Sequence, residues 1–385
     1  MKNPLPAIAI GGPPHSGKSV LTYNLSQALR QQQIAHFVVR ACPDSEGDYS
    51  QEISSTLMRQ IRQKGQFDSE FVENVCRALR KRHYPLMVDV GGKPTEEQEA
   101  IFNECTHAII ISSDPKASPE WHDRVERHEL TLLADLHSIR SGKDEIVSAA
   151  STLRGQISDL ERGQKVDSPV FDLLLKRIGA FFTEFSSDVR ERHLNSAPSM
   201  PLDLARLGRA LAIQNDGTRW SPNDLLKVVD YLPTNEALSV FERGPTWLYA
   251  IIANHVYPAE LHQFDPCLGW VTPMKPKPFD GNESTHTKGP KLMWTLNEHA
   301  GFQRVELAIS EDGYLDYEDE LWFNPPPLSM DKGLILSGAL PMWLITGLVD
   351  LFHELPLLAI FQPSLEGAVV IKSSIPNWPI GSVIR

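Results

Sequence analysis

The sequence predicts an α/β protein: a mostly parallel sheet domain followed by two related α+β modules of sheet and helix. Three observations predict it. Residues 7–115 alternate apolar stretches with helix-periodic ones, which is typical of βαβ units. A glycine-rich turn joins the first apolar stretch to the first helix. Finally, the phrase PTWL at 245–248 recurs as PMWL at 341–344, each time before an apolar run, which indicates a duplication.

Composition limits the class of protein. The chain has 385 residues, 41% hydrophobic and 22% charged, with a formal net charge of −12. This length suits two or three domains, and the acidic balance argues against a long nucleic-acid partner. No run of about eighteen apolar residues and no signal-peptide core is found, so we expect no membrane association. The four cysteines lack metal-ligand spacing, which favours free thiols in a cytoplasmic protein.

The first functional motif follows the apolar strand expected at 7–10. Its letters GPPHSGKS, from Gly12 to Ser19, fit the pattern G-x-x-x-x-G-K-S/T. Glycines let such a loop curl until backbone N–H groups point at phosphate oxygens, and the helix expected over 20–33 adds a positive dipole. Lys18 would reach the β- and γ-phosphates and Ser19 would ligate Mg²⁺. The residues expected to bind nucleotide are Gly12, His15, Ser16, Gly17, Lys18 and Ser19.

Further strands and helices complete the first domain. Strands are expected at 34–39, 84–92 and 107–115, with an amphipathic helix at 68–82. Asp89 ends the third strand, where it would hold Mg²⁺ together with Ser19, although an aspartate there also suits a turn or helix cap. Three carboxylates after the second strand allow either a metal-bound water or a solvated acidic loop; they are Asp44, Glu46 and Asp48.

These motifs resemble the P-loop NTPase superfamily. The DVGG tip at 89–92 is similar to that of its small-molecule-kinase and partitioning-ATPase branches, so the resemblance implies ATP and Mg²⁺ as cofactors. Residues 118–193 are expected to be largely helical, roughly at 118–139, 146–162 and 168–187. The polar stretch NSAPSMP at 195–201 reads as a linker, which bounds a nucleotide-binding domain of residues 1–195 with a helical C-terminal part.

The duplicated half divides into copies at 200–275 and 292–385. Each copy carries an apolar run that predicts a short buried helix, then a strand, a tight turn and another strand. Alternating stretches upstream predict hairpin strands at 210–217 and 225–232 in the first copy, and at 303–310 and 314–322 in the second. The segment 276–291, rich in Pro, Gly and Lys, is expected to be a tether, or a basic lid over an anionic ligand.

The two copies resemble the CRISPR-associated ring nucleases, which degrade the second messenger cyclic tetra-adenylate. That family carries a stretch like S-G-R-G-P-x-W-L, a helical histidine and a D-P-R-L-G turn. The first copy has RGPTWL at 243–248, His255 and DPCLG at 265–269, whereas the second keeps SGALPMWL at 337–344 and QPSLEG at 362–367. The resemblance extends over residues 203–385, and family members occur fused to a P-loop domain.

The resemblance implies a metal-dependent phosphodiesterase that favours Mn²⁺. A ribose 2′-hydroxyl attacks the neighbouring phosphate, which requires proton transfer and stabilisation of negative charge. By this resemblance His255 acts as acid or base, Asp265 holds the metal or orients a reacting group, and Arg243 with Gly244 binds the ligand. A homo-oligomer is implied as well, since the family often builds its site between subunits. The protein would be a type III CRISPR accessory protein.

Some positions depart from the family pattern. Cys267 stands where the family has an arginine, and Gln362 replaces the aspartate in the second copy, where His353 falls two places late. One or both copies would then bind without cleaving. From the residues alone, Asp265 also suits a type I turn and His255 also suits a hydrogen-bonded core position.

Two other functions remain open. The first domain would be a small-molecule or nucleotide kinase, with the duplicated half an inactive cyclic-oligoadenylate sensor or an assembly platform. Alternatively, ATP binding alone drives oligomerisation, with the duplicated half as a passive interface.

Overall fold

The computed structural model describes residues 5–41, 69–114, 116–213, 220–278, 292–299, 301–309, 315 and 317–385. The predicted carboxylates Asp44, Glu46 and Asp48 lie outside the described residues, as does the part of the predicted tether at 279–291. The chain forms two compact units. The first is Met1–Asn195 with Pro266–Gly269, and the second is Ser196–Asp265 with Trp270–Arg385. Each unit is described separately below.

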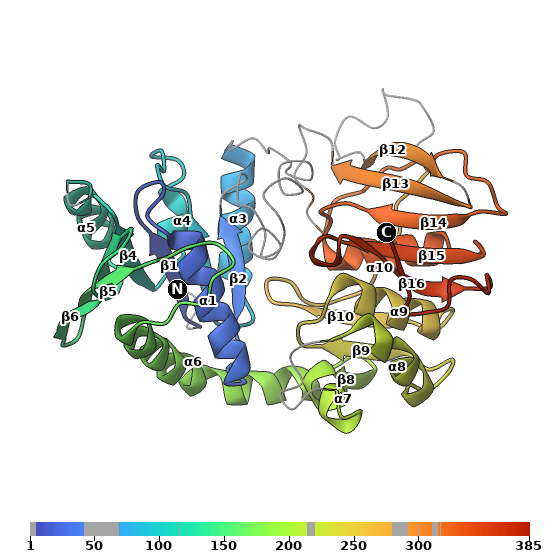
Figure 1. The fold of residues 1–385 in the computed structure, drawn as a ribbon, viewed down its shortest axis with the longest axis horizontal. Coiled ribbons are helices and arrows are strands. Elements are labelled where there is room, and N and C mark those ends of the chain that lie inside the picture. The colour runs from blue at the N-terminus through green and yellow to red at the C-terminus, as the bar shows by residue number, and fades with distance from the viewer. Residues whose placement is uncertain are drawn as a thin grey trace. The chain divides into compact units, whose positions relative to one another are not determined.

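A seven-stranded sheet forms the centre of the first unit (Figure 1). Its order is β2-β3-β1-β4-β5-β7-β6, and every pair is parallel except β6 with β7. The strands are β1 (Ala7–Gly11), β2 (Phe37–Ala41), β3 (Leu86–Val90), β4 (His107–Ser112), β5 (Thr131–Ile139), β6 (Glu145–Ala149) and β7 (Leu153–Ser158). The strand order reverses at β1, because β3 and β2 lie on one side of it and β4 to β7 lie on the other. In parallel sheets, ligands bind at such switch points, outside the carboxyl ends of the strands.

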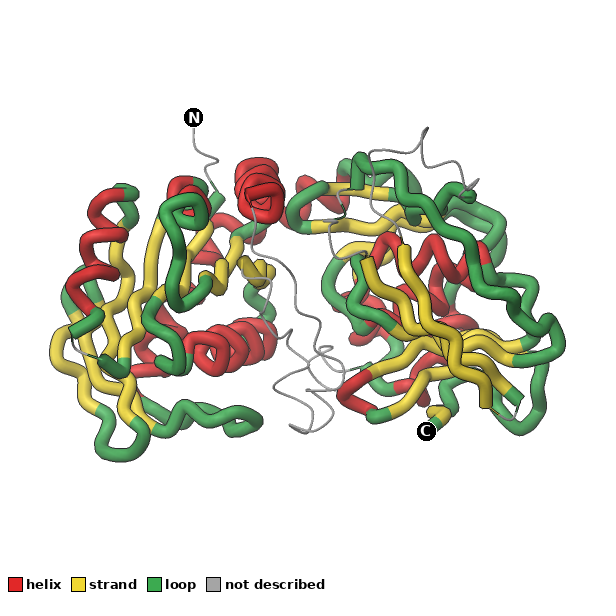
Figure 2. Tube along the Cα trace, turned by 90° about the horizontal axis from the view of Figure 1, so that it is seen from above, coloured by secondary structure: helices red, strands yellow, loops and turns green. Residues whose placement is uncertain are grey.

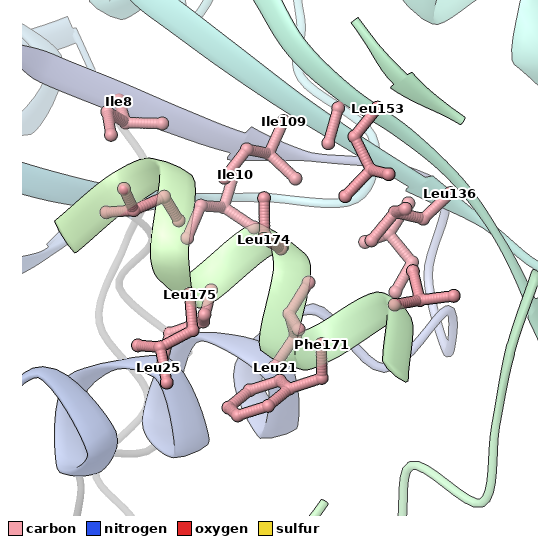
Figure 3. Close-up of a cluster of buried hydrophobic side chains, with 14 of the residues drawn as sticks. Ile8, Ile10, Leu21, Leu25, Ile109, Leu136, Leu153, Phe171, Leu174 and Leu175 are labelled. Carbon is pink, nitrogen blue, oxygen red and sulfur yellow. The ribbon is translucent and has the colours of Figure 1, made fainter. Parts of the chain in front are cut away.

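Helices cover both faces of this sheet. They are α1 (Lys18–Gln31), α3 (Ser69–Lys81), α4 (Ala100–Asn103), α5 (Ser118–Arg127) and α6 (Pro169–Asn195). One face packs on α1 and α6, where strand residues such as Ile8, Ile10 and Ile109 meet Leu21 and Leu174 (Figure 3). The opposite face packs on α3, α4 and α5. Burial on both faces explains why β1, β3 and β4 read as continuous apolar runs.

The structure corrects the prediction of helices at 118–139 and 146–162. Only Ser118–Arg127 is helical, and β5, β6 and β7 occupy most of the remaining span. The helical C-terminal part expected for this domain is therefore reduced to α5 and α6. In β5, buried residues alternate with more exposed ones from Ala134 onward, which is the two-residue period of a strand. The turn around Gly142, whose φ is +152°, separates β5 from β6 and would break a helix.

The second unit contains two sheets (Figure 1). The four-stranded sheet has the order β11-β10-β9-β8, and the six-stranded sheet runs from β12 to β17 in sequence order. The smaller sheet is built from β8 (Met200–Asp203), β9 (Leu238–Phe241), β10 (Leu261–Asp265) and β11 (Gly269–Val271). The larger one is built from β12 (Leu292–His299), β13 (Phe302–Ile309), β14 (Gly333–Ser337), β15 (Leu357–Gln362), β16 (Gly367–Ser373) and β17 (Val383–Ile384).

The two sheets repeat one chain path. In the first, β8, β9 and β10 are parallel neighbours, α9 (Thr246–Val256) links β9 to β10, and a tight turn leads to β11. In the second, β13, β14 and β15 are parallel neighbours, α10 (Met342–Leu351) links β14 to β15, and a tight turn leads to β16. The helices α9 and α10 contact each other, and α9 also packs on β15 and β16. Figure 2 shows the helices of the second unit in red beside its strands in yellow.

Equivalent positions of the two copies meet in space. The rings of Tyr257 and His353, which occupy the same place after α9 and α10, have centroids 4.2 Å apart. Contact between matching residues is the signature of a two-fold arrangement passing close to them. Gln263 of β10 donates to the Thr346 hydroxyl of α10 at 2.8 Å, which ties the first sheet to the second helix.

Three strand predictions in this unit are corrected. In the first copy, α8 (Leu225–Tyr231) occupies the stretch predicted as a strand at 225–232. The helix α7 (Leu204–Ala210) ends where a strand is predicted at 210–217, residues 211–213 form no strand, and residues 214–217 lie outside the described residues. Asp203 caps α7 by accepting from the N–H groups of Ala205 and Arg206, which starts a helix at that point. In the second copy, residues 317–319 form turns and bends rather than part of a strand at 314–322, while β12 has no counterpart among the predicted strands. None of the described helices has the length and apolar character needed to span a bilayer.

Candidate functional site

The loop between β1 and α1 has a shape that requires glycine at two positions. Gly12 has φ +151°, and a Cβ there would lie 1.8 Å from the Ile111 carbonyl oxygen. Gly17 has φ +86°, and its Cβ would lie 2.7 Å from Cδ1 of Leu160. Any side chain at either position would push the loop off β4 or the segment after β7. The loop is therefore a narrow backbone cradle at the amino end of α1, a geometry that binds anions.

Lys18 curls back into this cradle. Its ammonium donates to the carbonyls of Gly12 and Pro13, each at 2.8 Å, and the residue is 9% exposed. Ser16 donates to Pro13 O at 2.8 Å, whereas His15 is exposed with φ +62°. The structure thus brings together all six residues predicted to bind nucleotide: Gly12, His15, Ser16, Gly17, Lys18 and Ser19. The Lys18 ammonium is therefore held by carbonyl oxygens of the loop itself.

Asp89 lies beside this loop at the end of β3. It is 4% exposed, and its Oδ2 accepts a hydrogen bond from the Ser19 hydroxyl at 3.1 Å. A hydroxyl and a carboxylate oxygen side by side are the ligand types that Mg²⁺ prefers, so the two residues predicted to hold the metal fit it chemically. The same Asp89 oxygen forms an ion pair with Arg40 of β2.

Arg40 is a residue of this site that sequence motifs do not reveal. The parallel register places Arg40 opposite Asp89, which in turn lies opposite Ile10 of β1. Arg40 therefore lies two strands away from β1, which leads into the loop at 12–17, and Asp89 of β3 lies between them. The sequence does hold one signal for it: an arginine and an aspartate each occupy the fourth position of a five-residue strand, FVVRA and LMVDV.

The arginines of α5 serve the fold instead. Arg124 is 7% exposed and donates to Glu99 at 2.9 Å and to Glu120 at 2.6 Å, while Arg127 donates to Glu99 at 2.7 Å. Burial opposes ionisation of Glu99, but its bonds with Arg124 and His128 outweigh this and lower its pKa. Arg124 is thus buried against Glu99, whereas the side chain of Arg127 is 56% exposed.

The second candidate site lies at the carboxyl ends of β9 and β10. Glu242, Arg243 and Gly244 follow β9, and Asp265 ends β10, so the parallel strands bring them to one edge. Tyr249 of α9 lies among them and donates to the Glu242 carbonyl at 2.5 Å. Burial raises the pKa of Tyr249, the charges of Glu242 and Asp265 raise it further, and Arg243 opposes them. The edge thus gathers both signs of charge around a neutral phenol.

Gly244 has a packing role at this edge. A Cβ at Gly244 would lie 2.9 Å from Leu204, 3.2 Å from Leu248 and 3.5 Å from Tyr249. A side chain there would displace the helix start that follows Pro245. The predicted ligand-binding residue therefore positions α9 and Tyr249 against the edge, and its backbone lies beside Arg243.

His255 lies elsewhere. It is in the last turn of α9, which starts after the carboxyl end of β9 and returns the chain to the amino end of β10. A helix rises about 1.5 Å per residue, so nine residues from Thr246 place His255 roughly 13 Å along α9 from the Arg243 edge. Its Nε2 contacts the Pro233 carbonyl oxygen at 3.1 Å. The structure therefore does not bring His255 and Asp265 of one chain together.

The second copy presents a different edge. Gln362 ends β15 and donates to Ser364 at 3.0 Å, and Ala339 stands where the first copy has Arg243. His353 contacts the Asp350 carbonyl oxygen at 2.7 Å and lies after α10, away from this edge. Cys267, in the turn after Asp265, packs against the apolar cluster of the first unit. In the part of the chain that the structure describes, no three His, Cys, Asp or Glu residues cluster to hold a metal ion.

Comparisons with known proteins give one family match and one similar protein. Residues 308–385, within the second copy, match the family model described as CRISPR-associated protein (Cas_csx3). An uncharacterized protein of Aquifex aeolicus (strain VF5) is 31% identical over 109 residues, which are 27% of this chain and 96% of that protein. Both the match and the relative are far shorter than the present chain. The match over residues 308–385 supports a CRISPR-associated role for the protein.

Proposed function

We propose that this CRISPR-associated protein binds and cleaves cyclic tetra-adenylate at the edge formed by Arg243 and Asp265, and that its loop at 12–19 binds ATP with Mg²⁺. The family match falls on the second copy, and the first copy repeats the chain path of the second, which supports assigning one ligand class to both. The observation that carries the proposal is the gathering of Arg243, Asp265 and Tyr249 at one strand edge.

The residues at this edge suit ring opening. Arg243 would neutralise a phosphate and stabilise the charge that develops during attack by the 2′-hydroxyl. Asp265 would accept the hydroxyl proton or hold Mn²⁺. Tyr249 stays protonated because its pKa is raised, so it donates hydrogen bonds and does not act as a base. His255 would join such a site only if a second chain presented it, which the expected homo-oligomer allows.

The test is direct incubation of the protein with cyclic tetra-adenylate, Mn²⁺ and ATP, followed by chromatography of the products. Linear tetra-adenylate made by the wild type, and lost in Arg243→Ala, supports the proposal. Tight binding without a linear product supports a sensor instead. Absence of both binding and product rejects the assignment of this ligand.

A second candidate function is phosphoryl transfer from ATP to a small acceptor. The adjacent Ser19 hydroxyl and Asp89 carboxylate, next to Lys18, favour it because transfer needs a metal held beside the phosphates. Labelled phosphate should then move to an acceptor in the full-length protein, unaffected by Arg243→Ala and lost in Lys18→Ala. If Lys18→Ala alters only assembly, ATP binding serves oligomerisation.

A further inference from the structure

The carboxylate expected to hold magnesium already has a cation of the chain's own. Arg40 and Asp89 face each other across β2 and β3, and their side chains are 14% and 5% exposed. Asp89 Oδ2, which pairs with Arg40, also accepts the Ser19 hydrogen bond. A metal ion that uses this oxygen, directly or through water, therefore competes with a guanidinium for the same atom.

Arg40 cannot simply leave. Its side chain is largely buried, and a buried guanidinium without an anion is strongly destabilising. A bound magnesium nucleotide would compensate both charges: the metal replaces the guanidinium beside Asp89, and the phosphates offer Arg40 an anion in place of Asp89. Arginine is suited to this exchange because its planar fork matches carboxylate and phosphate alike.

The place of Arg40 decides which phosphate it would meet. Lys18 and the loop at 12–17 lie at the amino end of α1, whereas Arg40 reaches the same strand-end region from β2, beside Asp89 and Ser19. The metal in such sites lies next to the terminal phosphates. The arginines of α5 are held by Glu99 and Glu120, which leaves them committed to the fold.

We propose that Arg40 exchanges Asp89 for the terminal phosphate of the bound nucleotide, and so makes the site discriminate ATP from ADP. The inference rests on the proposed nucleotide site at 12–19 and goes beyond it by naming the residue that reads the third phosphate. In this scheme Asp89 binds either Arg40 or the metal, and the presence of a nucleoside triphosphate decides which of the two it binds.

The experiment measures ATP and ADP affinity by calorimetry with excess Mg²⁺ for the full-length wild type and for Arg40→Ala. We expect the wild type to prefer ATP, and the variant to lose about 30-fold in ATP affinity, the scale of a charged hydrogen bond, with ADP affinity changed less than about threefold. The matched control is Arg80→Ala, which removes an exposed arginine paired with Glu104 and should leave both affinities unchanged.

A second variant controls for misfolding of Arg40→Ala. Arg40→Lys keeps a positive charge opposite Asp89 but cannot grip phosphate with two parallel bonds, so it should lose part of the ATP preference. An equal loss for ATP and ADP, or an ATP preference unchanged in both variants, overturns the role of Arg40. Failure of the wild type to bind either nucleotide rejects the nucleotide site itself, and the inference with it.

Discussion

After β9, the first copy of the C-terminal unit carries Glu242 and Arg243, whereas the second copy carries Gly338 and Ala339 after β14. The next strand ends in Asp265 in one copy and in Gln362 in the other. Between these ends the copies agree: a proline precedes each helix, a buried tryptophan begins it, and the helix runs back across its sheet.

The residues that the copies share stabilise the fold of each module, whereas the residues that differ are those that could contact a ligand. Trp247 and Trp343 are 2% and 4% exposed, so both anchor their helices in the core. The residues that differ in charge lie outside this shared frame, at the strand ends. At these two equivalent positions, one copy has Arg243 and Asp265, while the other has Ala339 and Gln362.

The strongest test of the shared frame replaces each tryptophan with alanine. We expect Trp247→Ala and Trp343→Ala each to lower the free energy of unfolding by about 3–5 kcal/mol, the usual cost of a large cavity in a core. Urea denaturation followed by circular dichroism measures both. If only one substitution destabilises the protein, the two helices do not play the same structural part.

The next test concerns the strand that ends in Asp265 or Gln362. Asp265→Asn should lower cleavage of cyclic tetra-adenylate by about 100-fold, the lower range for losing a positioned proton acceptor. The matched change Gln362→Ala should alter it less than about twofold, because a glutamine amide is neither an acid nor a base. Initial rates with Mn²⁺ compare them. Equal losses would mean that both edges take part in the reaction.

Arg243 distinguishes the copies in binding. Arg243→Ala should weaken binding of the cyclic ligand by about 10- to 30-fold, as expected when a charged hydrogen bond to phosphate is lost. Arg206→Ala is the control, since Arg206 is an exposed arginine of the same unit, with a side chain 66% exposed. Fluorescence anisotropy with labelled ligand measures both. An unchanged affinity in Arg243→Ala would move the ligand away from this edge.

The smallest effect is expected at His255. Because His255 lies at the far end of α9 and contacts the Pro233 carbonyl, His255→Ala should change cleavage less than about threefold in dilute monomer. Rates measured across protein concentration check this. A large loss that appears only at high concentration would show that a second chain supplies the histidine.

Local motifs are readable from the sequence, but long-range pairings are not. The loop at 12–19 and the helix after it are predictable because their chemistry lies in consecutive residues. The strands β5 to β7 are not, since charged and small residues in 131–158 obscure the two-residue period that burial makes plain. Tertiary packing decides the conformation of those segments.

The sites show the same limit. Arg40 depends on the register between β2 and β3, which no short motif reveals. His255 and Asp265 are close in sequence, yet a helix that crosses between parallel strands places its two ends at opposite edges of the sheet. That rule, applied to the predicted strand, helix and strand, is enough to separate the two residues.

Glu242 carries a consequence for the history of the duplication. Its φ is +86°, in the left-handed region, at the position that Gly338 occupies in the other copy with φ +155°. A glutamate there costs about 1 kcal/mol or more that glycine avoids, and the Tyr249 phenol holds its carbonyl in place. Stability alone would therefore favour glycine at position 242, as the second copy has at position 338.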